Sequence, residues 1–251
     1  MALFETRGLT KRFLGVTAVD GVDLAVEAGE LVSLIGPNGS GKTTLFNCVT
    51  GYLAPDGGRV LFRGQDVTGA AAHRIARLGV GRTFQLVSVF PRLSALENLL
   101  TFLQQHQEER FVGRLLRAPG VRRMEAAAVE RARSLLDSVG LGARAGAPAG
   151  TLSYGQRKLL AFAAALMPDP ELLLLDEPAA AVNPTMIEQM KGQIRALHRA
   201  GKTVLLVEHN MDVVMDISQR VVVLDHGQKI AEGPPEVVRR DPKVIEAYFG
   251  R

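Results

Sequence analysis

A glycine-rich segment around residue 40 has the composition and spacing of a phosphate-binding loop. Residues 36–43 read Gly-Pro-Asn-Gly-Ser-Gly-Lys-Thr and match the pattern G-x-x-x-x-G-K-[ST]. Glycines let the backbone turn so that successive N–H groups point at phosphate oxygens, and the N-terminus of a following helix adds a partial positive charge. The Lys42 ammonium suits the β- and γ-phosphates, and the Thr43 hydroxyl suits Mg²⁺. The segment predicts a site for a nucleoside triphosphate and Mg²⁺. Its predicted contact residues are Gly36, Pro37, Asn38, Gly39, Ser40, Gly41, Lys42, Thr43 and Thr44.

Two adjacent carboxylates follow a run of four leucines. Residues 172–177 read Leu-Leu-Leu-Leu-Asp-Glu, which predicts a buried strand that ends in Asp176 and Glu177. Ligands of open α/β sheets lie beyond the carboxyl ends of the strands, so both acids are expected to face the phosphate-binding loop. Asp176 is then placed to hold Mg²⁺, directly or through water, and Glu177 to polarise the water that attacks the γ-phosphate.

Short apolar runs alternate with longer helical patterns and predict the scaffold for these residues. Nearly all-apolar runs occur at Leu31–Ile35, Leu172–Leu175, Thr203–Val207 and Val221–Leu224, as expected for parallel strands covered on both faces. Helical patterns follow three of these runs, at Lys42–Thr50, Pro184–Arg199 and Met211–Ile217. This alternation predicts an α/β fold with a mostly parallel sheet.

Other parts of the chain depart from that alternation. Residues 1–30 and 58–67 have the short strands and glycine turns of an antiparallel β-subdomain, and residues 94–145 are mostly helical in pattern. Arg110–Arg123 contains five arginines, which predicts either a solvated loop or a basic contact surface for a partner or for anionic lipid. Pro234–Arg251 predicts two short helices that are broken at Asp241-Pro242.

The composition is that of an ordinary globular protein and excludes several classes. The 251 residues are 47% hydrophobic and 22% charged, with a formal net charge of +4, which excludes disordered, collagen-like and disulfide-stapled chains. A lone Cys48 gives no intramolecular disulfide, and Met1–Thr10 has no pattern of a signal peptide. The longest apolar stretch, Leu159–Met167, is too short to span a membrane. A cytoplasmic location is the expectation.

A third motif, together with the first two, resembles one protein family closely. Leu152–Gln156 reads Leu-Ser-Tyr-Gly-Gln and resembles the LSGGQ signature of ABC transporter ATP-binding subunits. It precedes a helical pattern and lies upstream of the acidic strand, as in that family. In the family, the signature serine and glycines bind the ATP that the opposing subunit holds. The resemblance therefore implies that Ser153, Gly155 and Gln156 contact ATP across a head-to-tail dimer.

The same resemblance gives further positions a role. Gln85 matches the glutamine of the Q-loop, which in the family reaches Mg²⁺ and the attacking water. His209 matches the switch histidine at the γ-phosphate, and Phe13 stands where the family stacks an aromatic ring on adenine, although Val19 is an alternative for that contact. Pro178–Pro184 corresponds to the D-loop. Glu177, His209 and Gln85 are thus the expected catalytic residues, and Thr43, Gln85 and Asp176 the expected metal ligands.

Four residues differ from the common family pattern. Tyr154 replaces the first signature glycine, and Asn183 replaces the usual aspartate of the D-loop. Ala181 replaces a common glycine beside it, and Ala164 replaces an arginine that often follows the signature. Tyr154 and Asn183 occur in one branch of the family, so they leave hydrolysis intact.

The branch that the sequence resembles is that of the ATPases of branched-chain amino acid importers. The similarity lies in the Leu-Ser-Tyr-Gly-Gln form, Pro178–Pro184, residues 82–85 and the ending Asp241–Gly250, and the helical insert around Arg110–Arg123 is similar to that of the larger ATPase subunit. Urea and amide importers share much of the pattern. The resemblance implies membrane permeases, a second ATPase subunit and, indirectly, a substrate-binding protein as partners, with no nucleic acid. It implies a peripheral place on the inner face of the cell membrane.

The resemblance also implies a division of the chain and a docking surface. Residues 1–251 would form one nucleotide-binding domain, with a catalytic lobe of 1–93 and 168–251 and a helical signature lobe of 94–167. Helices within Ser94–Gln107 would receive a coupling helix of a permease. Two alternatives are a soluble ABC ATPase of DNA repair or translation and a scaffold that binds ATP without appreciable turnover. The intact Glu177 and His209 disfavour the scaffold.

Overall fold

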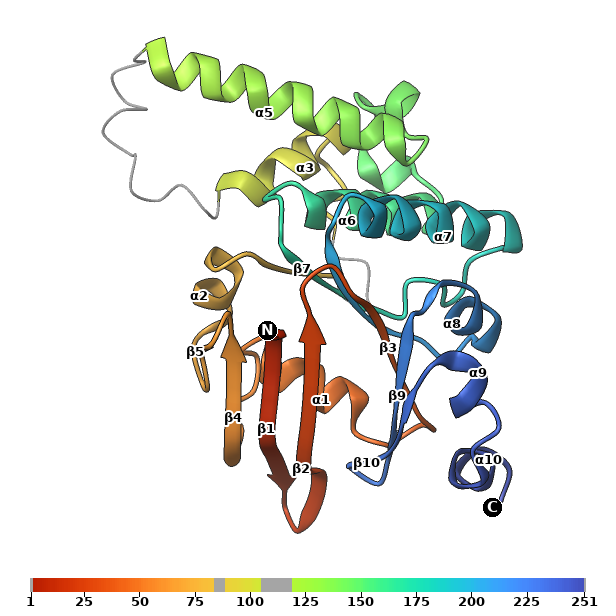
Figure 1. The fold of residues 1–251 in the computed structure, drawn as a ribbon. Coiled ribbons are helices and arrows are strands. Elements are labelled where there is room, and N and C mark those ends of the chain that lie inside the picture. The colour runs from red at the N-terminus through yellow and green to blue at the C-terminus, as the bar shows by residue number, and fades with distance from the viewer. Residues whose placement is uncertain (1, 84–88, 105–118, 251) are drawn as a thin grey trace.

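The fold is built on two β-sheets. It was obtained as a computed structural model that describes residues 2–83, 89–104 and 119–250. A six-stranded sheet has the order β10-β9-β3-β8-β7-β6, and a four-stranded sheet has the order β2-β1-β4-β5. Figure 1 shows the four-stranded sheet beside the larger sheet, with a group of helices above both.

The larger sheet carries the predicted buried strands. From β9 to β6 neighbouring strands run parallel, and β10 pairs with β9 in the antiparallel sense. Its strands are β3 (Leu31–Ile35), β6 (Val80–Arg82), β7 (Leu172–Asp176), β8 (Thr203–Val207), β9 (Arg220–Asp225) and β10 (Gln228–Gly233). The prediction of a mostly parallel sheet is confirmed. The sequence analysis missed β6 and β10, because a three-residue strand and a polar edge strand give little hydrophobic pattern.

The smaller sheet is antiparallel, as predicted for residues 1–30 and 58–67. Its strands are β1 (Ala2–Phe13), β2 (Val16–Glu27), β4 (Gly57–Phe62) and β5 (Gln65–Asp66). Buried and exposed residues alternate along the second half of β2, because one face of this sheet meets the core and the other meets solvent. The β1–β2 turn brings Phe13 to the tip of a hairpin.

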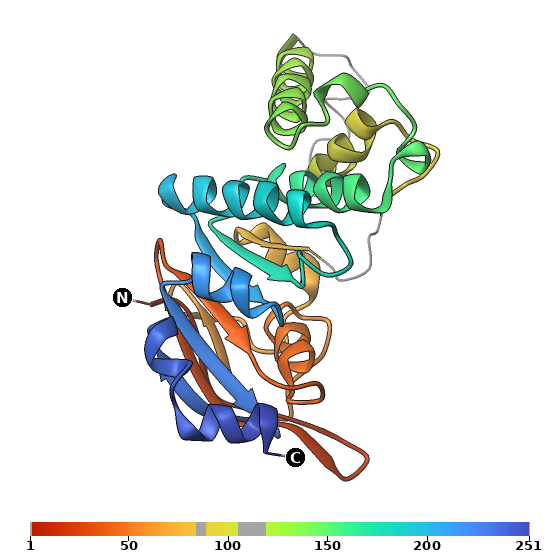
Figure 2. The same cartoon turned by 90° about the vertical axis from the view of Figure 1, so that its right-hand side faces the viewer.

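Nine α-helices and two short 3₁₀ turns complete the described part of the chain. The α-helices are α1 (Lys42–Val49), α2 (Ala72–Arg77), α3 (Ala95–Gln104), α5 (Pro119–Ser138), α6 (Tyr154–Leu166), α7 (Pro184–Arg199), α8 (Met211–Ile217), α9 (Pro235–Val238) and α10 (Pro242–Phe249), and short 3₁₀ turns lie at Gly142–Arg144 (η2) and Ala149–Thr151 (η3). Figure 2 shows α9 and α10 at the end of the molecule opposite to α5, with α8 between them and α7.

Three apolar clusters hold the layers together, and strand alternation assigns each residue to one of them. Leu172 and Leu174 face a cluster that the two sheets share with α1, whereas Leu173 and Leu175 face the cluster under α3, α5, α6 and α7. A smaller cluster joins β3 and β9 to α8, α9 and α10. The all-apolar strands are therefore covered on both faces, which explains why no polar residue interrupts the four leucines.

Helix ends coincide with capping residues in the sequence. Asn183 caps α7 by accepting a hydrogen bond from the Met186 N–H, and Pro184 occupies the first turn. Asp241 caps α10 in the same way. The predicted break at Asp241-Pro242 is confirmed, because it separates α9 from α10. None of the helices in residues 2–83, 89–104 and 119–250 is long and apolar enough to cross a membrane.

Candidate functional site

The phosphate-binding loop leaves β3 and enters α1, as the sequence predicts. Gly36 has φ 149°, and a side chain there would meet the Leu224 carbonyl oxygen at 2.1 Å. Gly41 has φ 101°, and a side chain there would meet the Ala18 carbonyl oxygen at 2.2 Å. Glycine is required at both positions, because the loop turns through left-handed conformations while it lies against neighbouring backbone. The loop is thereby shaped by the core, and Asn38, Gly39 and Thr43 remain exposed.

Lys42 lies folded into its own loop. Its Nζ donates to the carbonyl oxygens of Gly36 at 2.7 Å and Pro37 at 2.9 Å, and to Ser40 Oγ at 3.3 Å. Burial lowers the pKa of Lys42, and the nearby carboxylates of Asp176 and Glu177 oppose that effect. The ammonium is thus a partly desolvated cation held by neutral oxygens, which phosphate oxygens can replace with stronger charge-assisted bonds.

Asp176 is the more buried of the two acids. Burial raises the pKa of Asp176, while the Arg82 guanidinium, hydrogen-bonded to its carboxylate, and the Lys42 ammonium act in the opposite direction. Arg82 Nη2 donates to Asp176 Oδ2 at 3.0 Å, and both side chains are less than one-tenth exposed. Arg82 was not predicted as a site residue, although it lies only three residues before Gln85 in the sequence. The signal was weak, because one arginine at the end of a short strand has no characteristic spacing.

Glu177 has a different environment from its neighbour. Its side chain is one-fifth exposed, and Oε2 lies 3.7 Å from Nδ1 of His209, whose side chain is 56% exposed. Its backbone has φ 47°, a left-handed conformation that costs a non-glycine residue on the order of 1–3 kcal/mol. Both residues are among the expected catalytic residues, and the structure places their side chains next to each other. The Glu177 carboxylate can accept a proton from water. The neighbouring His209 imidazole is open to solvent and can contact the phosphate of a bound nucleotide.

A buried cation and a buried anion hold the backbone that follows Glu177. Lys158 Nζ on α6 donates to the carbonyl oxygens of Glu177 at 3.0 Å, Pro178 at 3.3 Å and Ala180. Glu208 Oε1 accepts from the Ala179 N–H at 2.7 Å. We call this segment, Glu177–Ala181, the D-turn. These contacts stabilise its strained conformation.

Glu208 also holds the chain that carries His209. Glu208 Oε2 accepts from the N–H groups of His209 at 3.1 Å and Asn210 at 3.2 Å, and Glu208 is fully buried. Glu208 and Lys158 were not among the predicted site residues. A carboxylate directly after an all-apolar strand is the signal that found Asp176, and it applies equally to Glu208.

The signature segment starts α6. Ser153 Oγ accepts from the Gln156 N–H at 3.2 Å, and Gln156 Oε1 accepts from the Ser153 N–H at 3.0 Å, which is a capping box. Ser153 and Tyr154 are exposed. A side chain at Gly155 would meet Met186 Sδ at 2.2 Å, so the glycine lets α6 approach α7. The signature therefore presents an ordered helix N-terminus to solvent.

The departures from the family pattern fit this geometry in different ways. Asn183 supplies the N-cap of α7, a role that asparagine and aspartate share. Ala181 has φ 57°, so the alanine that replaces a common glycine adopts a left-handed conformation. Ala164 is buried within the cluster under α6 and α7. Tyr154 is exposed, and its ring lies 5.8 Å from Lys158 Nζ.

The remaining predicted positions are placed unequally. Phe13 is 41% exposed, and Lys11 Nζ lies 5.4 Å from the centre of its ring. Val19 is fully buried in the core, so only Phe13 of this pair offers a surface to a base. Gln85 lies outside the described residues, as do residues 110–118 of the basic segment. Cys48 is buried on α1, and burial raises the pKa of its thiol to about 11.

The oxygen donors at the site suit magnesium. Mg²⁺ is held in proteins by one or two carboxylates together with substrate phosphates, and the Asp176 carboxylate and the Thr43 hydroxyl supply such oxygens. Within the part of the chain that the structure describes, no three His, Cys, Asp or Glu residues form a metal cluster. The arrangement fits a cation that arrives with a nucleotide.

A separate cavity of about 420 Å³ opens on the other side of Arg82. We call it the β6 groove, because all three residues of β6 line it. Its lining residues are Thr50, Tyr52, Ala72, His73, Ile75, Ala76, Gly79, Val80, Gly81, Arg82, Phe102, Ala165, Pro168 and Pro170. Tyr52 is 55% exposed. Phe102 comes from α3, so one of the predicted docking helices contributes to the groove.

Comparison with known proteins defines the class to which this site belongs. Residues 19–180 match the family model described as ABC transporter, and residues 228–251 match the one described as Branched-chain amino acid ATP-binding cassette transporter. The chain belongs to the ABC transporter family and is one of its ATP-binding, ATP-hydrolysing subunits.

Individual relatives share the whole chain. It is 46% identical over 249 residues to the high-affinity branched-chain amino acid transport ATP-binding protein BraF of Pseudomonas aeruginosa, with 99% of this chain and 98% of that protein covered. It is 43% identical, with the same coverage, to LivG of Escherichia coli strain K12, which carries the same description. A nucleotide-free ATP-binding cassette from an ABC transporter has a TM-score of 0.86 at 35% identity, and both chains are fully covered. The ADP conformation of an ATP-binding cassette of an ABC transporter has a TM-score of 0.86 at 34% identity, again with full coverage of both chains. The predicted family and fold class are confirmed.

Proposed function

We propose that this chain energises the uptake of branched-chain amino acids through membrane permease subunits. The observation that carries the proposal is the convergence of Lys42, Asp176, Glu177 and His209 at one edge of the sheet, in a chain whose relatives carry that transport function in their names. Transported substrate does not contact such a subunit, so the substrate assignment rests on the relatives alone.

At the site, Lys42 exchanges its loop carbonyls for β- and γ-phosphate oxygens. The contacts of the loop with ATP come from the backbone of Gly36–Thr44, and Phe13 covers the adenine. Asp176 and Thr43 would hold Mg²⁺, with Gln85 as a further ligand, and the cation would neutralise charge on the phosphates. Glu177 takes the proton of the attacking water, and His209 contacts the γ-phosphate.

One chain carries two half-sites in this scheme. Ser153, Gly155 and Gln156 stand at an exposed helix N-terminus, which suits binding of phosphate from outside the chain. Two subunits, either two copies or this chain and a second ATPase, close head to tail around two ATP molecules. The catalytic lobe comprises residues 1–93 and 168–251, and the signature lobe comprises residues 94–167.

The permease docks at the β6 groove, on the inner face of the membrane. The groove is open, and the aromatic rings of Tyr52 and Phe102 offer the apolar surface that a docked helix needs. A substrate-binding protein acts indirectly through the permeases, and nucleic acid has no part. The net charge of +4 suits ATP and the acidic membrane surface.

Reconstitution of the chain with membrane permeases, a second ATPase and a binding protein of a branched-chain amino acid importer tests this proposal. Leucine, isoleucine or valine is expected to stimulate ATP hydrolysis when the binding protein is present. Stimulation by urea or an amide instead would reassign the importer while keeping the ATPase role. ATP turnover that no permease alters would contradict the transport proposal.

A further inference from the structure

Arg82 stands between the β6 groove and the acidic end of β7. It is the last residue of β6, its side chain is 7% exposed, and it lines the groove. Nη1 donates to Asn47 Oδ1 at 2.8 Å and to Thr50 Oγ1 at 2.7 Å, while Nη2 donates to Asp176 Oδ2 at 3.0 Å. One guanidinium thus connects the end of the P-loop helix α1 to the carboxylate beyond β7.

The Nη1 and Nη2 nitrogens of Arg82 hold the Asp176 carboxylate in a fixed position relative to α1. Because α1 begins at Lys42 and Thr43, Arg82 sets the distance between Asp176 and the residues at the opposite end of the same helix. Arg82 bonds to Oδ2 of Asp176, and among the described residues no hydrogen bond reaches Oδ1, so Oδ1 is available to a cation. Lysine carries the same charge but lacks the planar fork that reaches both sides at once.

The groove side of Arg82 carries an aromatic contact. The guanidinium lies 5.4 Å from the centre of the Tyr52 ring and 5.8 Å from that of Phe46. Phe46 is fully buried, whereas Tyr52 is 55% exposed in the groove. A helix that docks in the groove therefore touches a ring that packs directly on the guanidinium.

We propose that Arg82 is a positioning residue that orients Asp176 for Mg²⁺ and, through Tyr52, joins that carboxylate to the β6 groove. The inference rests on the proposed magnesium role of Asp176. Tyr52 and Arg82 thereby link the β6 groove to the metal ligand Asp176. This link does not involve the Q-loop. Movement of Tyr52 on docking shifts the guanidinium, which changes the hold of Asp176 on the cation.

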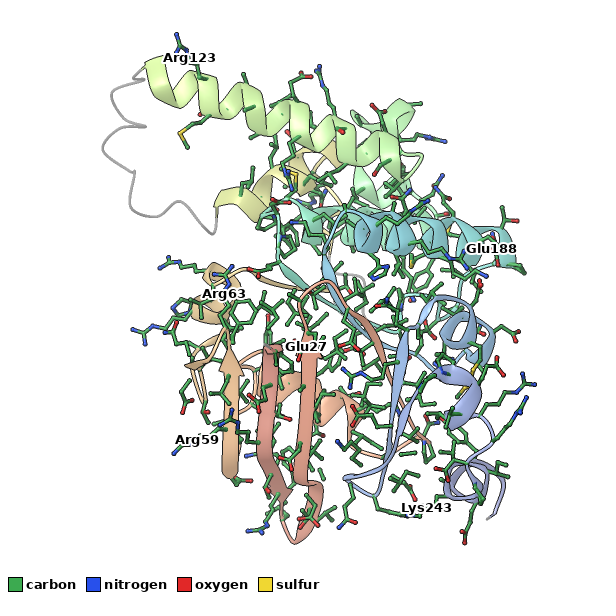
Figure 3. All side chains as sticks on the ribbon, in the orientation of Figure 1. Glu27, Arg59, Arg63, Arg123, Glu188 and Lys243 are labelled. Carbon is green, nitrogen blue, oxygen red and sulfur yellow. The ribbon has the colours of Figure 1, made fainter. Side chains whose placement is uncertain are left out.

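The test measures the affinity of the isolated chain for a fluorescent ATP analogue, with Mg²⁺ and with EDTA. Arg82→Lys is expected to weaken binding on the order of tenfold in Mg²⁺, as is typical when the partner of a metal ligand is changed, and to leave binding in EDTA within about twofold. Arg63→Lys is the matched control, because Arg63 pairs with Glu171 at the other end of β7 and its side chain is 56% exposed. Figure 3 shows Arg63 at the outer edge of the molecule, close to α2. This control is expected to change neither affinity.

Tyr52→Ala tests the link to the groove without touching the P-loop. It is expected to weaken binding about threefold in Mg²⁺ only, since a cation–π contact of this kind is modest. Equal weakening in Mg²⁺ and EDTA by Arg82→Lys would show a merely structural role and overturn the proposal, as would no weakening at all. An unchanged Tyr52→Ala variant would overturn the link to the groove.

Folding and the proposed function are separated from this inference by two further measurements. Thermal unfolding shows whether Arg82→Lys folds; if it does not, Asn47→Ala, which removes one hydrogen-bond partner of Nη1, is expected to give a smaller loss confined to Mg²⁺. Equal loss in EDTA for Asn47→Ala would overturn the proposal. A wild-type chain that hydrolyses ATP but binds the analogue equally in Mg²⁺ and EDTA would contradict the role of Asp176 and the inference together, while the ATPase assignment would stand.

Discussion

The phosphate-binding loop and the signature segment are prepared for ATP in opposite ways. In the loop, the Lys42 ammonium is buried and hydrogen-bonded to three oxygens of its own loop. In the signature segment, Ser153 is exposed at the start of α6, and its backbone is already ordered by the reciprocal bonds with Gln156. One region is closed on itself and the other is open and rigid.

Because of this difference, the conformational cost of ATP binding falls on the phosphate-binding loop. Lys42 must give up its carbonyl partners, which charge-assisted bonds to phosphate more than replace. The backbone of the signature is already ordered by its capping box, and Ser153 is exposed. In the proposed scheme, the loop sets the nucleotide affinity of a single chain, and the signature contributes when a second chain arrives.

The largest expected effect comes from Glu177, which lies on the D-turn between the two regions. Glu177→Gln removes the proton acceptor and keeps the size of the side chain, so hydrolysis is expected to fall about 10²–10⁴-fold. Affinity for ATP is expected to stay within about threefold, because Lys42 is untouched. Steady-state phosphate release and nucleotide titration measure the two quantities. Unchanged turnover would show that another group acts as the base.

The second expected effect concerns Lys42 and would break the comparison if absent. Lys42→Ala removes a cation whose charge-assisted bonds are worth about 1.5–3 kcal/mol each, so ATP affinity of the single chain is expected to fall about 100-fold. Lys191→Met is the matched control, because Lys191 is a buried lysine that pairs with Asp216 away from the loop. Equal loss of affinity in both variants would point to damaged folding instead.

The third effect tests the D-turn. Lys158→Met removes the ammonium that three carbonyl oxygens share, so the strained Glu177 backbone is expected to relax. The turnover number is expected to fall roughly tenfold, which corresponds to about 1.4 kcal/mol of activation free energy. The ATP affinity of the single chain is expected to stay constant. Lys202→Met, at a partly exposed lysine, serves as the control. A matching fall in affinity would place Lys158 in the binding site instead.

The fourth effect sharpens the contrast at the signature. Ser153→Ala breaks the capping box and is expected to lower the free energy of unfolding by about 1 kcal/mol. ATP affinity of the single chain is expected to remain unchanged, and hydrolysis to fall because the second half-site is impaired. Thr151→Ala changes a hydroxyl that bonds only a nearby carbonyl in the preceding turn, so it is the control for hydrolysis. Weaker ATP binding by a single Ser153→Ala chain would contradict the division of roles.

The smallest effect lies at Asp169, in the connection between α6 and β7. Asp169 pairs with Lys202 and with Arg131 of α5, and these partners lower the pKa of its carboxyl. A depressed carboxyl pKa contributes stability above the unfolded-state value of 3.8, and this is lost as the pH falls through the folded-state value. Asp169→Asn is expected to destabilise the chain by less than about 1 kcal/mol at pH 7, and by nothing well below the folded-state pKa. Urea unfolding at both pH values measures the difference, and a constant difference would exclude this ion pair as its cause.

The sequence predicted the parts of the site that have a local pattern. The phosphate-binding loop, the strand before Asp176 and the capped helices α7 and α10 were all found, because glycine spacing, apolar runs and capping residues act over a few positions. Arg82, Lys158 and Glu208 were missed as site residues. Each acts on a segment that is remote in sequence or on backbone atoms, so only the packing of β6, α6 and β8 around the D-turn reveals its partner.

The mass of the Glu177→Gln variant in solution tests most directly that each chain carries two half-sites. With Mg²⁺ and ATP, light scattering is expected to give twice the 27.0 kDa of one chain, with one ATP bound per chain. Adding Ser153→Arg is expected to return the mass to that of one chain while ATP stays bound. Two results together would contradict the account: the Glu177→Gln variant binds ATP but remains a single chain, and the wild-type chain hydrolyses ATP without a second ATPase.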